Sequence, residues 1–210
     1  MCTRYYIEKS PELRPFVDTA KASYLGTQMV AKLGKPLSME GEIRPADMVP
    51  VIASNKKGFR SVFPMVWGYN VPGLERPLIN ARIETAGVKE IWMEGWKSHR
   101  CAVPASWYYE WKYLQMGEKK VKTKEKYMIQ ERGKAKLFLA GIYRMEVFRG
   151  LSSPVFSIIT QETPKELRWL NDRMPLILPE DRIDEWIKPE TKAEDMLQYS
   201  QTDLIVEKAC

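Results

Sequence analysis

A single carboxylate, that of Glu110, lies within the dense run of aromatic and apolar residues between Arg100 and Lys112. Burial disfavours the charged form of a carboxyl group and raises its pKa. A carboxyl group in such surroundings can act as a general acid or base near neutral pH. Alternatively, Glu110 ends a strand and pairs with a surface Arg or Lys, and this stretch alone leaves both interpretations open.

Cys2, the second residue, is the other candidate for chemistry. The chain has three cysteines, Cys2, Cys101 and Cys210, and one histidine, His99. Their spacing matches neither a zinc site nor a disulfide framework. We therefore predict that the protein binds no metal and no cofactor and that it works in a reducing compartment. Cys101 lies in an apolar run, where we expect a buried small hydrophobe. We expect His99 on the surface.

Length and charge set broad limits. The 210 residues suit one domain, 1–210, and the 33 basic against 27 acidic residues give a net charge of +6 and a pI near 9.1. A basic chain favours an anionic partner such as nucleic acid. The N-terminus lacks the apolar segment of a signal peptide, and no apolar run is long enough to span a membrane. These features predict a soluble, cytoplasmic, monomeric protein without membrane contact.

The elements that position these residues are short strands interleaved with helices. Residues 4–7 are aromatic and β-prone and predict a first strand that holds Cys2 in place. Without regular βαβ spacing, the pattern predicts an α+β fold with a β-rich, barrel-like mixed sheet and flanking helices. Further strands are expected at 48–54, 61–68, 77–80, 136–143 and 155–160, and helices at 10–34, 85–97 and 164–170, with an amphipathic C-terminal tail.

A lysine-rich segment covers residues 119–136, around Gly133. A solvated hairpin is the first interpretation of such a charge run, and a nucleic-acid contact is the second.

Five short motifs occur in order along almost the whole chain. They are Met1-Cys2, Asn80-Ala-Arg-Ile-Glu-Thr85, Arg100-Cys-Ala-Val-Pro-Ala105 with Tyr109-Glu-Trp111, Ala140-Gly-Ile142 and Arg173-Met-Pro-Leu-Ile-Leu178. With these motifs the chain resembles the SRAP family, the SOS response-associated peptidases. Trp67-Gly68 also fits a family segment, although Tyr69-Asn70 replaces its usual continuation.

The resemblance implies a bacterial protein that removes Met1 by autoproteolysis and attaches Cys2 covalently to abasic sites in single-stranded DNA of the nucleoid. An abasic sugar presents an aldehyde when its ring opens. An N-terminal cysteine carries an amine that forms an imine with this carbon and a thiol that then closes a thiazolidine. An internal cysteine lacks the free amine and offers only a reversible thiohemiacetal.

By the same resemblance, Asn80 lies beside Cys2 and orients the amine or the sugar oxygen. Glu110 moves protons during ring opening, imine formation and removal of Met1.

The resemblance also suggests DNA contacts. Arg4, Arg82 and Arg173 are expected to bind phosphates and to lower the pKa values of the Cys2 amine and thiol. Trp67 and Trp111 either stack on bases or pack in the core.

Asn171 departs from the family pattern, which has histidine two residues before the Arg-Met-Pro motif. Asparagine keeps a hydrogen bond but transfers no proton, so we expect slower crosslinking with Asn171 positioning the substrate. Thr3 is a second departure, because the family commonly has Gly there. Two other functions stay open: a thiol peptidase acting on other proteins with Cys2 as nucleophile, and a non-catalytic binder of single-stranded nucleic acid.

Overall fold

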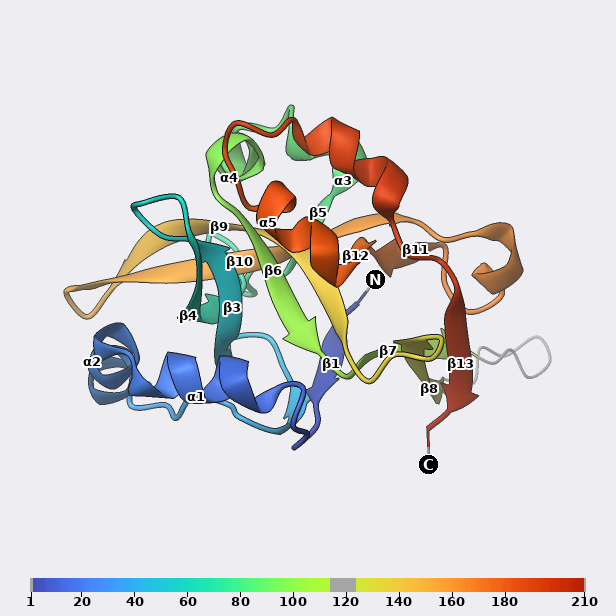
Figure 1. Ribbon diagram of the computed structural model, residues 1–210, viewed down its shortest axis with the longest axis horizontal. Coiled ribbons are helices and arrows are strands. Elements are labelled where there is room, and N and C mark those ends of the chain that lie inside the picture. The colour runs from blue at the N-terminus through green and yellow to red at the C-terminus, as the bar shows by residue number, and fades with distance from the viewer. Residues whose placement is uncertain (1, 114–123, 210) are drawn as a thin grey trace.

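Five strands form a closed barrel in the computed structural model, which describes residues 2–113 and 124–209. The order β10-β4-β3-β6-β9 closes because β9 also pairs with β10 (Figure 1). The sheet is mixed, since β4 runs parallel to β10 and the other barrel pairs are antiparallel. The predicted α+β, barrel-like fold is therefore confirmed. The strands are β3 (Met48–Ser54), β4 (Arg60–Trp67), β6 (Arg100–Ala105), β9 (Leu137–Phe148) and β10 (Leu151–Glu162).

Burial on both faces explains the continuous apolar runs in these strands. Successive strand side chains point to opposite faces, so Val51 and Cys101 contribute to one hydrophobic cluster while Ile52 and Ala102 contribute to another. All six residues of β6 are buried. Cys101 is fully buried, as expected, and burial raises the pKa of its thiol.

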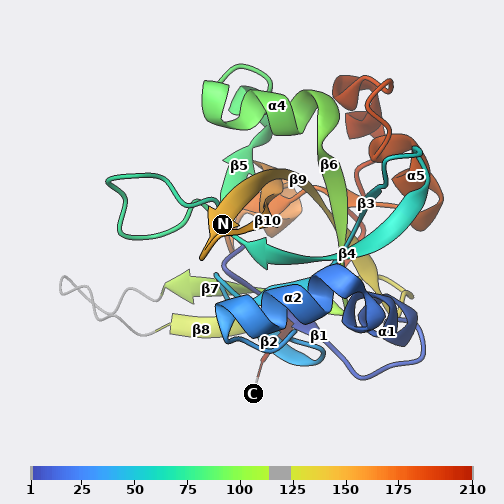
Figure 2. The same cartoon turned by 90° about the vertical axis from the view of Figure 1, so that its left-hand side faces the viewer.

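Helices cover the outside of the barrel. α1 and α2 pack on β3 and β4, whereas α4 and α5 lie on the other side (Figures 1 and 2). Gly34 ends α2 with a φ of 67°, a conformation that glycine adopts without strain. The helical elements are α1 (Arg14–Ala22), α2 (Tyr24–Leu33), α3 (Ile83–Ala86), α4 (Glu90–Ser98), α5 (Ile183–Trp186) and the 3₁₀ segments Lys165–Leu167, Glu180–Arg182 and Ala193–Tyr199.

A second sheet extends from the barrel where β6 continues into β7. Its order is β13-β8-β7-β1-β2, antiparallel throughout. The sheet contains the predicted first strand, β1 (Arg4–Ile7), together with β2 (Gly41–Ile43), β7 (Trp107–Tyr113), β8 (Lys124–Glu131) and β13 (Leu204–Lys208). Three short strands outside this sheet are β5 (Asn80–Arg82), β11 (Arg173–Pro175) and β12 (Ile177–Leu178). Of the lysine-rich segment, residues 124–131 form β8 and residues 119–123 lie outside the described residues.

The predicted helix at 164–170 is only one 3₁₀ turn, at Lys165–Leu167. The Thr163 amide donates to the Asp172 carbonyl over 3.0 Å, and Arg168 Nε donates to the Thr163 carbonyl over 3.0 Å. These bonds close the segment into a compact loop instead of a helix.

Arg100 joins the barrel to the C-terminal segment from a buried position. Its guanidinium donates to the backbone carbonyls of Trp186 (2.6 Å), Trp96 (2.7 Å), Lys97 (3.1 Å), Thr191 (2.7 Å) and Lys188.

Replacing Arg100 with Met should lower the free energy of unfolding by at least about 3 kcal/mol, because several carbonyls lose their donor inside the fold. Urea denaturation measures the loss. Arg14→Met, in an exposed i,i+4 pair with Asp18, is the control and should change stability by no more than about 0.5 kcal/mol. Equal effects of the two substitutions would contradict the role of Arg100.

Candidate active site

The pairing of β1 with β7 brings Cys2 towards Glu110. Arg4 lies opposite Tyr109 in this antiparallel pair, so the residues before Arg4 run beside Glu110 and Trp111. The Cys2 side chain is fully buried, and its thiol donates to the Arg4 carbonyl over 3.5 Å. The N-terminal strand therefore fixes the sulfur within the fold.

Asn80 holds the backbone of Cys2. Its Nδ2 donates to the Cys2 carbonyl over 2.8 Å. Asn80 begins β5 and lies opposite Ile158 of β10, so the barrel itself sets its position. Its Oδ1 is buried and accepts no hydrogen bond from any residue that the structure describes. The predicted proximity of Asn80 and Cys2 is present.

Glu110 and Asn171 form a second pair beside Cys2. Glu110 is 4% exposed, and its Oε2 accepts a hydrogen bond of 2.9 Å from Asn171 Nδ2. Asn171 Oδ1 accepts from the Arg173 amide over 3.1 Å, so both ends of the asparagine side chain are used. Burial raises the pKa of Glu110, and the hydrogen bond from Asn171 opposes part of this shift.

The pKa of the Cys2 thiol differs from the expectation. Nearby arginines were predicted to lower it, but it is raised, first by burial and then by the charge of Glu110. The charge of Arg4 lowers this pKa, but it is the smallest of the contributions, and the cost of an ionised sulfur away from water is the largest. The thiol is therefore protonated in this state and needs a proton acceptor before it can attack.

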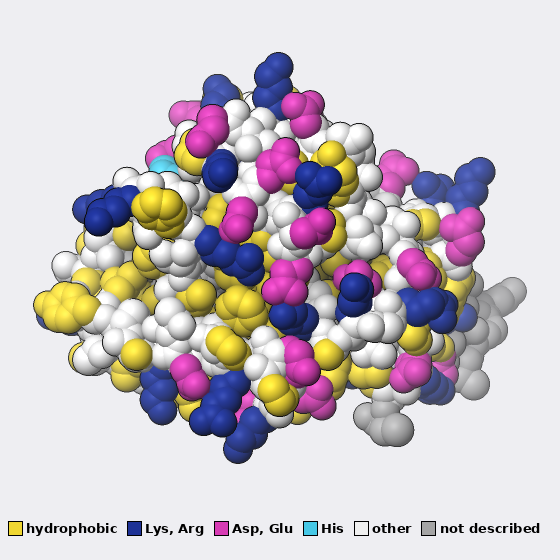
Figure 3. All heavy atoms as spheres, viewed as in Figure 1, with side chains coloured by type: hydrophobic (Ala, Val, Ile, Leu, Met, Phe, Trp, Pro, Cys, Tyr) yellow, Lys and Arg dark blue, Asp and Glu magenta, His cyan; other side chains and the backbone are white. Residues whose placement is uncertain are grey.

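A cleft of about 940 Å³ opens over this group. It lies on the side of the molecule where the segment between β4 and β5 and the ends of β7 and β8 project (Figure 2). Among the residues that the structure describes, four cationic side chains and one carboxylate, that of Glu110, line it, which makes it suited to an anionic ligand. The lining residues are Thr3, Arg4, Arg44, Pro45, Arg76, Pro77, Ile79, Glu110, Trp111, Lys124 and Asn171. The face seen in Figure 3 differs from the cleft, because positive and negative side chains are intermixed there.

Glu42 organises the cations at one edge of the cleft. Its carboxylate lies 3.4 Å from Arg4 Nε and 3.6 Å from Arg44 Nε, and it accepts a hydrogen bond from Lys126. Although partial burial opposes the change, the hydrogen bond from Lys126 and the charges of Lys126, Arg44 and Arg4 hold the pKa of Glu42 below its usual range. Glu42 is thus ionised and keeps Arg4 and Arg44 together.

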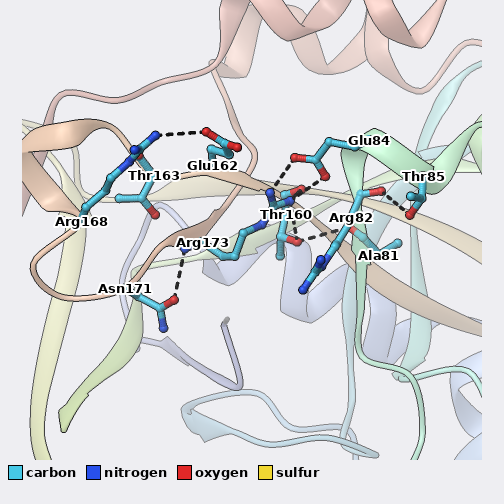
Figure 4. A network of polar contacts seen from close by, with 10 residues as sticks. All are labelled: Ala81, Arg82, Glu84, Thr85, Thr160, Glu162, Thr163, Arg168, Asn171 and Arg173. Carbon is cyan, nitrogen blue, oxygen red and sulfur yellow. Dashed lines mark hydrogen bonds and ion pairs between the residues drawn. The ribbon is translucent and has the colours of Figure 1, made fainter.

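Arg173 does not face the cleft as the predicted phosphate ligand. Its guanidinium makes two hydrogen bonds to the Glu84 carboxylate, of 2.6 and 3.0 Å, and one of 2.6 Å to the Thr160 carbonyl (Figure 4). It is only 8% exposed. Its visible role is to anchor the chain next to Asn171. Arg82 is exposed but is not among the residues that line the cleft, so its phosphate contact stays a prediction.

Trp67 lies in the core, which is one of the two alternatives that the sequence left open for it. Its side chain is fully buried, packs near Phe156 and Tyr5, and donates from Nε1 to the Ile79 carbonyl over 3.0 Å. No base can reach such a ring. Trp111 is half-buried and lines the cleft.

Sequence patterns missed Arg44 and Arg76, which line the cleft, whereas Lys124 belongs to the lysine-rich segment for which a nucleic-acid contact was the second interpretation. Arg44 follows Ile43, which pairs with Tyr5, so the neighbourhood of Arg4 and Arg44 depends on the β1–β2 register. No local motif reveals that register. A single arginine after a short strand, such as Arg44, does not by itself indicate a ligand-binding residue.

The barrel, the buried Cys2 and the Glu110–Asn171 pair fit one class of protein. Comparison with known families identifies this class. The model of the family described as SOS response associated peptidase (SRAP) matches residues 1–207, so the chain belongs to the SRAP family.

Similar proteins include the Bacillus subtilis protein named abasic site processing protein YoaM, with 35% identity over 122 residues, or 58% of this chain and 52% of that protein. The Escherichia coli protein named abasic site processing protein YedK is 31% identical over 144 residues, or 68% of this chain and 62% of that protein. The matched part of the chain therefore spans a little more than half the length of these relatives.

Solved structures share the fold. A protein from Bacteroides thetaiotaomicron has a TM-score of 0.73 at 19% identity, with 100% of this chain and 92% of that chain covered. A phage-related protein from Bordetella bronchiseptica has a TM-score of 0.72 at 24% identity, with 99% of this chain and 94% of that chain covered.

Among the described residues, no helix is long and apolar enough to cross a membrane.

Proposed function

We propose that this protein forms a covalent crosslink with abasic sites in single-stranded DNA through Cys2, after Met1 has been removed. The observation that carries the proposal is the grouping of Cys2, Asn80, Glu110 and Asn171 at a cleft lined by four cations. The names of the relatives YoaM and YedK, abasic site processing proteins, support abasic sites as the target.

The reaction follows from the chemistry of an N-terminal cysteine. The freed α-amine of Cys2 adds to the aldehyde carbon of the open sugar, and loss of one water gives an imine. The thiol sulfur then attacks the imine carbon, and its proton ends on the nitrogen. The product is a five-membered thiazolidine that contains both the nitrogen and the sulfur of Cys2.

Each neighbouring residue has a separate task. Because burial keeps the thiol protonated, sulfur attack needs a proton acceptor, and Glu110 is a buried carboxylate whose charge already acts on this thiol. In its protonated form Glu110 can also assist the loss of water. Asn80 holds the Cys2 carbonyl, and its free Oδ1 is available to the amine or the sugar hydroxyl.

Removal of Met1 is assigned to the same group. Hydrolysis of the Met1–Cys2 peptide bond needs a proton for the departing Cys2 nitrogen, and Glu110 is the acid beside the strand that carries Cys2. The cations Arg4, Arg44, Arg76 and Lys124 bind phosphates, which carry no sequence information.

The test mixes the mature protein with an oligonucleotide that carries one abasic site and resolves the products on a denaturing gel. We expect a shifted band with the single-stranded abasic oligonucleotide. The same oligonucleotide with its sugar reduced to an alcohol lacks the aldehyde and should give none. Absence of a shifted band with the unreduced oligonucleotide after long incubation would refute the proposal.

Asn171→His should accelerate crosslinking about 10²-fold, because general acid–base assistance typically contributes that factor or more. A neutral imidazole has one donor and one acceptor, and these can replace the bonds that Asn171 makes to Glu110 and to the Arg173 amide. Single-turnover rates above pH 7 measure the change. Asn171→Ala, which loses both bonds, should be slower than the parent protein. An unchanged rate for Asn171→His would show that this position takes no part in proton transfer.

A further inference from the structure

Trp169, which is exposed, and Lys112, which is half-buried, form an aromatic–cation pair beside Glu110 and Asn171. The Trp169 side chain is 47% exposed, and Lys112 Nζ lies 5.0 Å from the centroid of its ring. A solvent-exposed indole next to an ammonium group is suited to bind a ligand that carries a planar ring and an anionic group. A nucleotide has a planar base and an anionic phosphate.

The spacing of this pair follows from the geometry of β7. Lys112 is two residues beyond Glu110 and points to the same face of the strand, while Trp169 is two residues before Asn171. The contact between Trp169 and Lys112 therefore continues the contact between Asn171 and Glu110 along the strand. Two strand residues span about 6.6–6.8 Å, so the Trp169–Lys112 pair lies about that far along β7 from the Glu110–Asn171 pair.

The loop that carries Trp169 is fixed on both sides of it. Leu167 and Leu170 pack against the hydrophobic core, and the Thr163–Asp172 backbone bond closes the loop. The Tyr127 ring meets Trp169 nearly perpendicularly, with centroids 5.2 Å apart. A ring held in this way loses little entropy when a base stacks on it.

We propose that Trp169 stacks on a base one or two nucleotides from the abasic sugar and that Lys112 pairs with the adjoining phosphate. The proposal rests on the function proposed above and adds a nucleotide contact to that site. It also supplies the stacking aromatic that buried Trp67 cannot provide. An indole can stack on any of the bases, so this contact contributes to affinity without giving a sequence preference.

The test measures reversible binding in a Cys2→Ser background, by anisotropy of labelled single strands with and without one abasic site. We expect Trp169→Ala to weaken binding about tenfold, within the range for loss of one base–aromatic stack. Trp169→Phe, which keeps a stacking ring, should retain most of the affinity. Phe59→Ala, at a side chain 66% exposed in the turn between β3 and β4, is the matched control and should leave binding unchanged.

A base-deletion scan then locates the contact. Each base flanking the abasic site is replaced in turn by a baseless sugar, and Trp169→Ala is compared with the parent. At one position, one or two nucleotides from the lesion, the difference between the two proteins should vanish.

Equal binding by Trp169→Ala and the parent, or a difference that persists at every position, would overturn the stacking contact. Failure of the proposed function is seen separately, as the absence of a crosslink with the unaltered cysteine.

Discussion

Replacing Cys2 with Ser should abolish the heat-stable crosslink to abasic DNA. The serine variant keeps an α-amine once Met1 is removed, so it can still form an imine, but it lacks the sulfur that closes the thiazolidine. We therefore expect a product only when borohydride reduces the imine. A denaturing gel with and without borohydride measures both species.

Cys101→Ala is the matched control for this substitution. Cys101 is fully buried in β6, and an internal cysteine has no free amine. The variant should crosslink like the parent protein. A stable crosslink from Cys2→Ser in the absence of borohydride would show that another residue is the nucleophile.

Glu110→Gln should slow crosslinking by about 10²–10⁴-fold, the usual contribution of one general acid–base group. Glutamine preserves the size of the side chain and can still accept the hydrogen bond from Asn171. Met1 is first removed from both proteins with an aminopeptidase, so that the loss of rate isolates proton transfer during crosslinking. Single-turnover kinetics on an abasic single strand measures the rate. A rate equal to that of the parent would remove Glu110 from the mechanism.

The pH dependence of the same variant gives a second check. Burial raises the pKa of Glu110, so the carboxylate form needed to accept the thiol proton is lost as the pH falls through this raised value. The parent should lose activity on that acidic limb, and Glu110→Gln should lack the limb.

A raised pKa also has a consequence for stability. A carboxyl group whose folded pKa exceeds its unfolded pKa contributes stability below the unfolded value, and this contribution is lost as the pH rises through the folded value. At pH values above the unfolded pKa, the buried Glu110 carboxyl group therefore costs stability. Glu110→Gln should melt at the same temperature as the parent or higher, so its slow reaction cannot be attributed to unfolding.

The fold was largely predictable because the barrel strands carry their own signals. Runs such as 48–54 and 155–160 are apolar on both faces, and β3 and β10 include them. The 3₁₀ loop at 164–170 was predicted as a helix, because its closure depends on bonds to Asp172 that local periodicity does not contain. The strand β13 was missed because its pairing partner, β8, lies far away in the sequence.

The candidate site was predictable only in part, because the surroundings of several of its residues depend on segments that are distant in the sequence. Ordered motifs identified Cys2, Asn80 and Glu110, and the structure brings Cys2 together with Asn80. The surroundings of Arg173 and Trp67 depend on tertiary partners, Glu84 for one and the barrel core for the other. The resemblance to the SRAP family suggested DNA contacts for both residues, whereas the structure buries Trp67 and pairs Arg173 with Glu84.

Crosslinking through Cys2 is tested by the intact mass of the protein after reaction with a single-stranded oligonucleotide carrying one abasic site. We expect one new species whose mass equals the chain without Met1 plus the oligonucleotide, less one water. An adduct on a chain that still carries Met1, or an adduct that has lost no water, would contradict thiazolidine formation at Cys2.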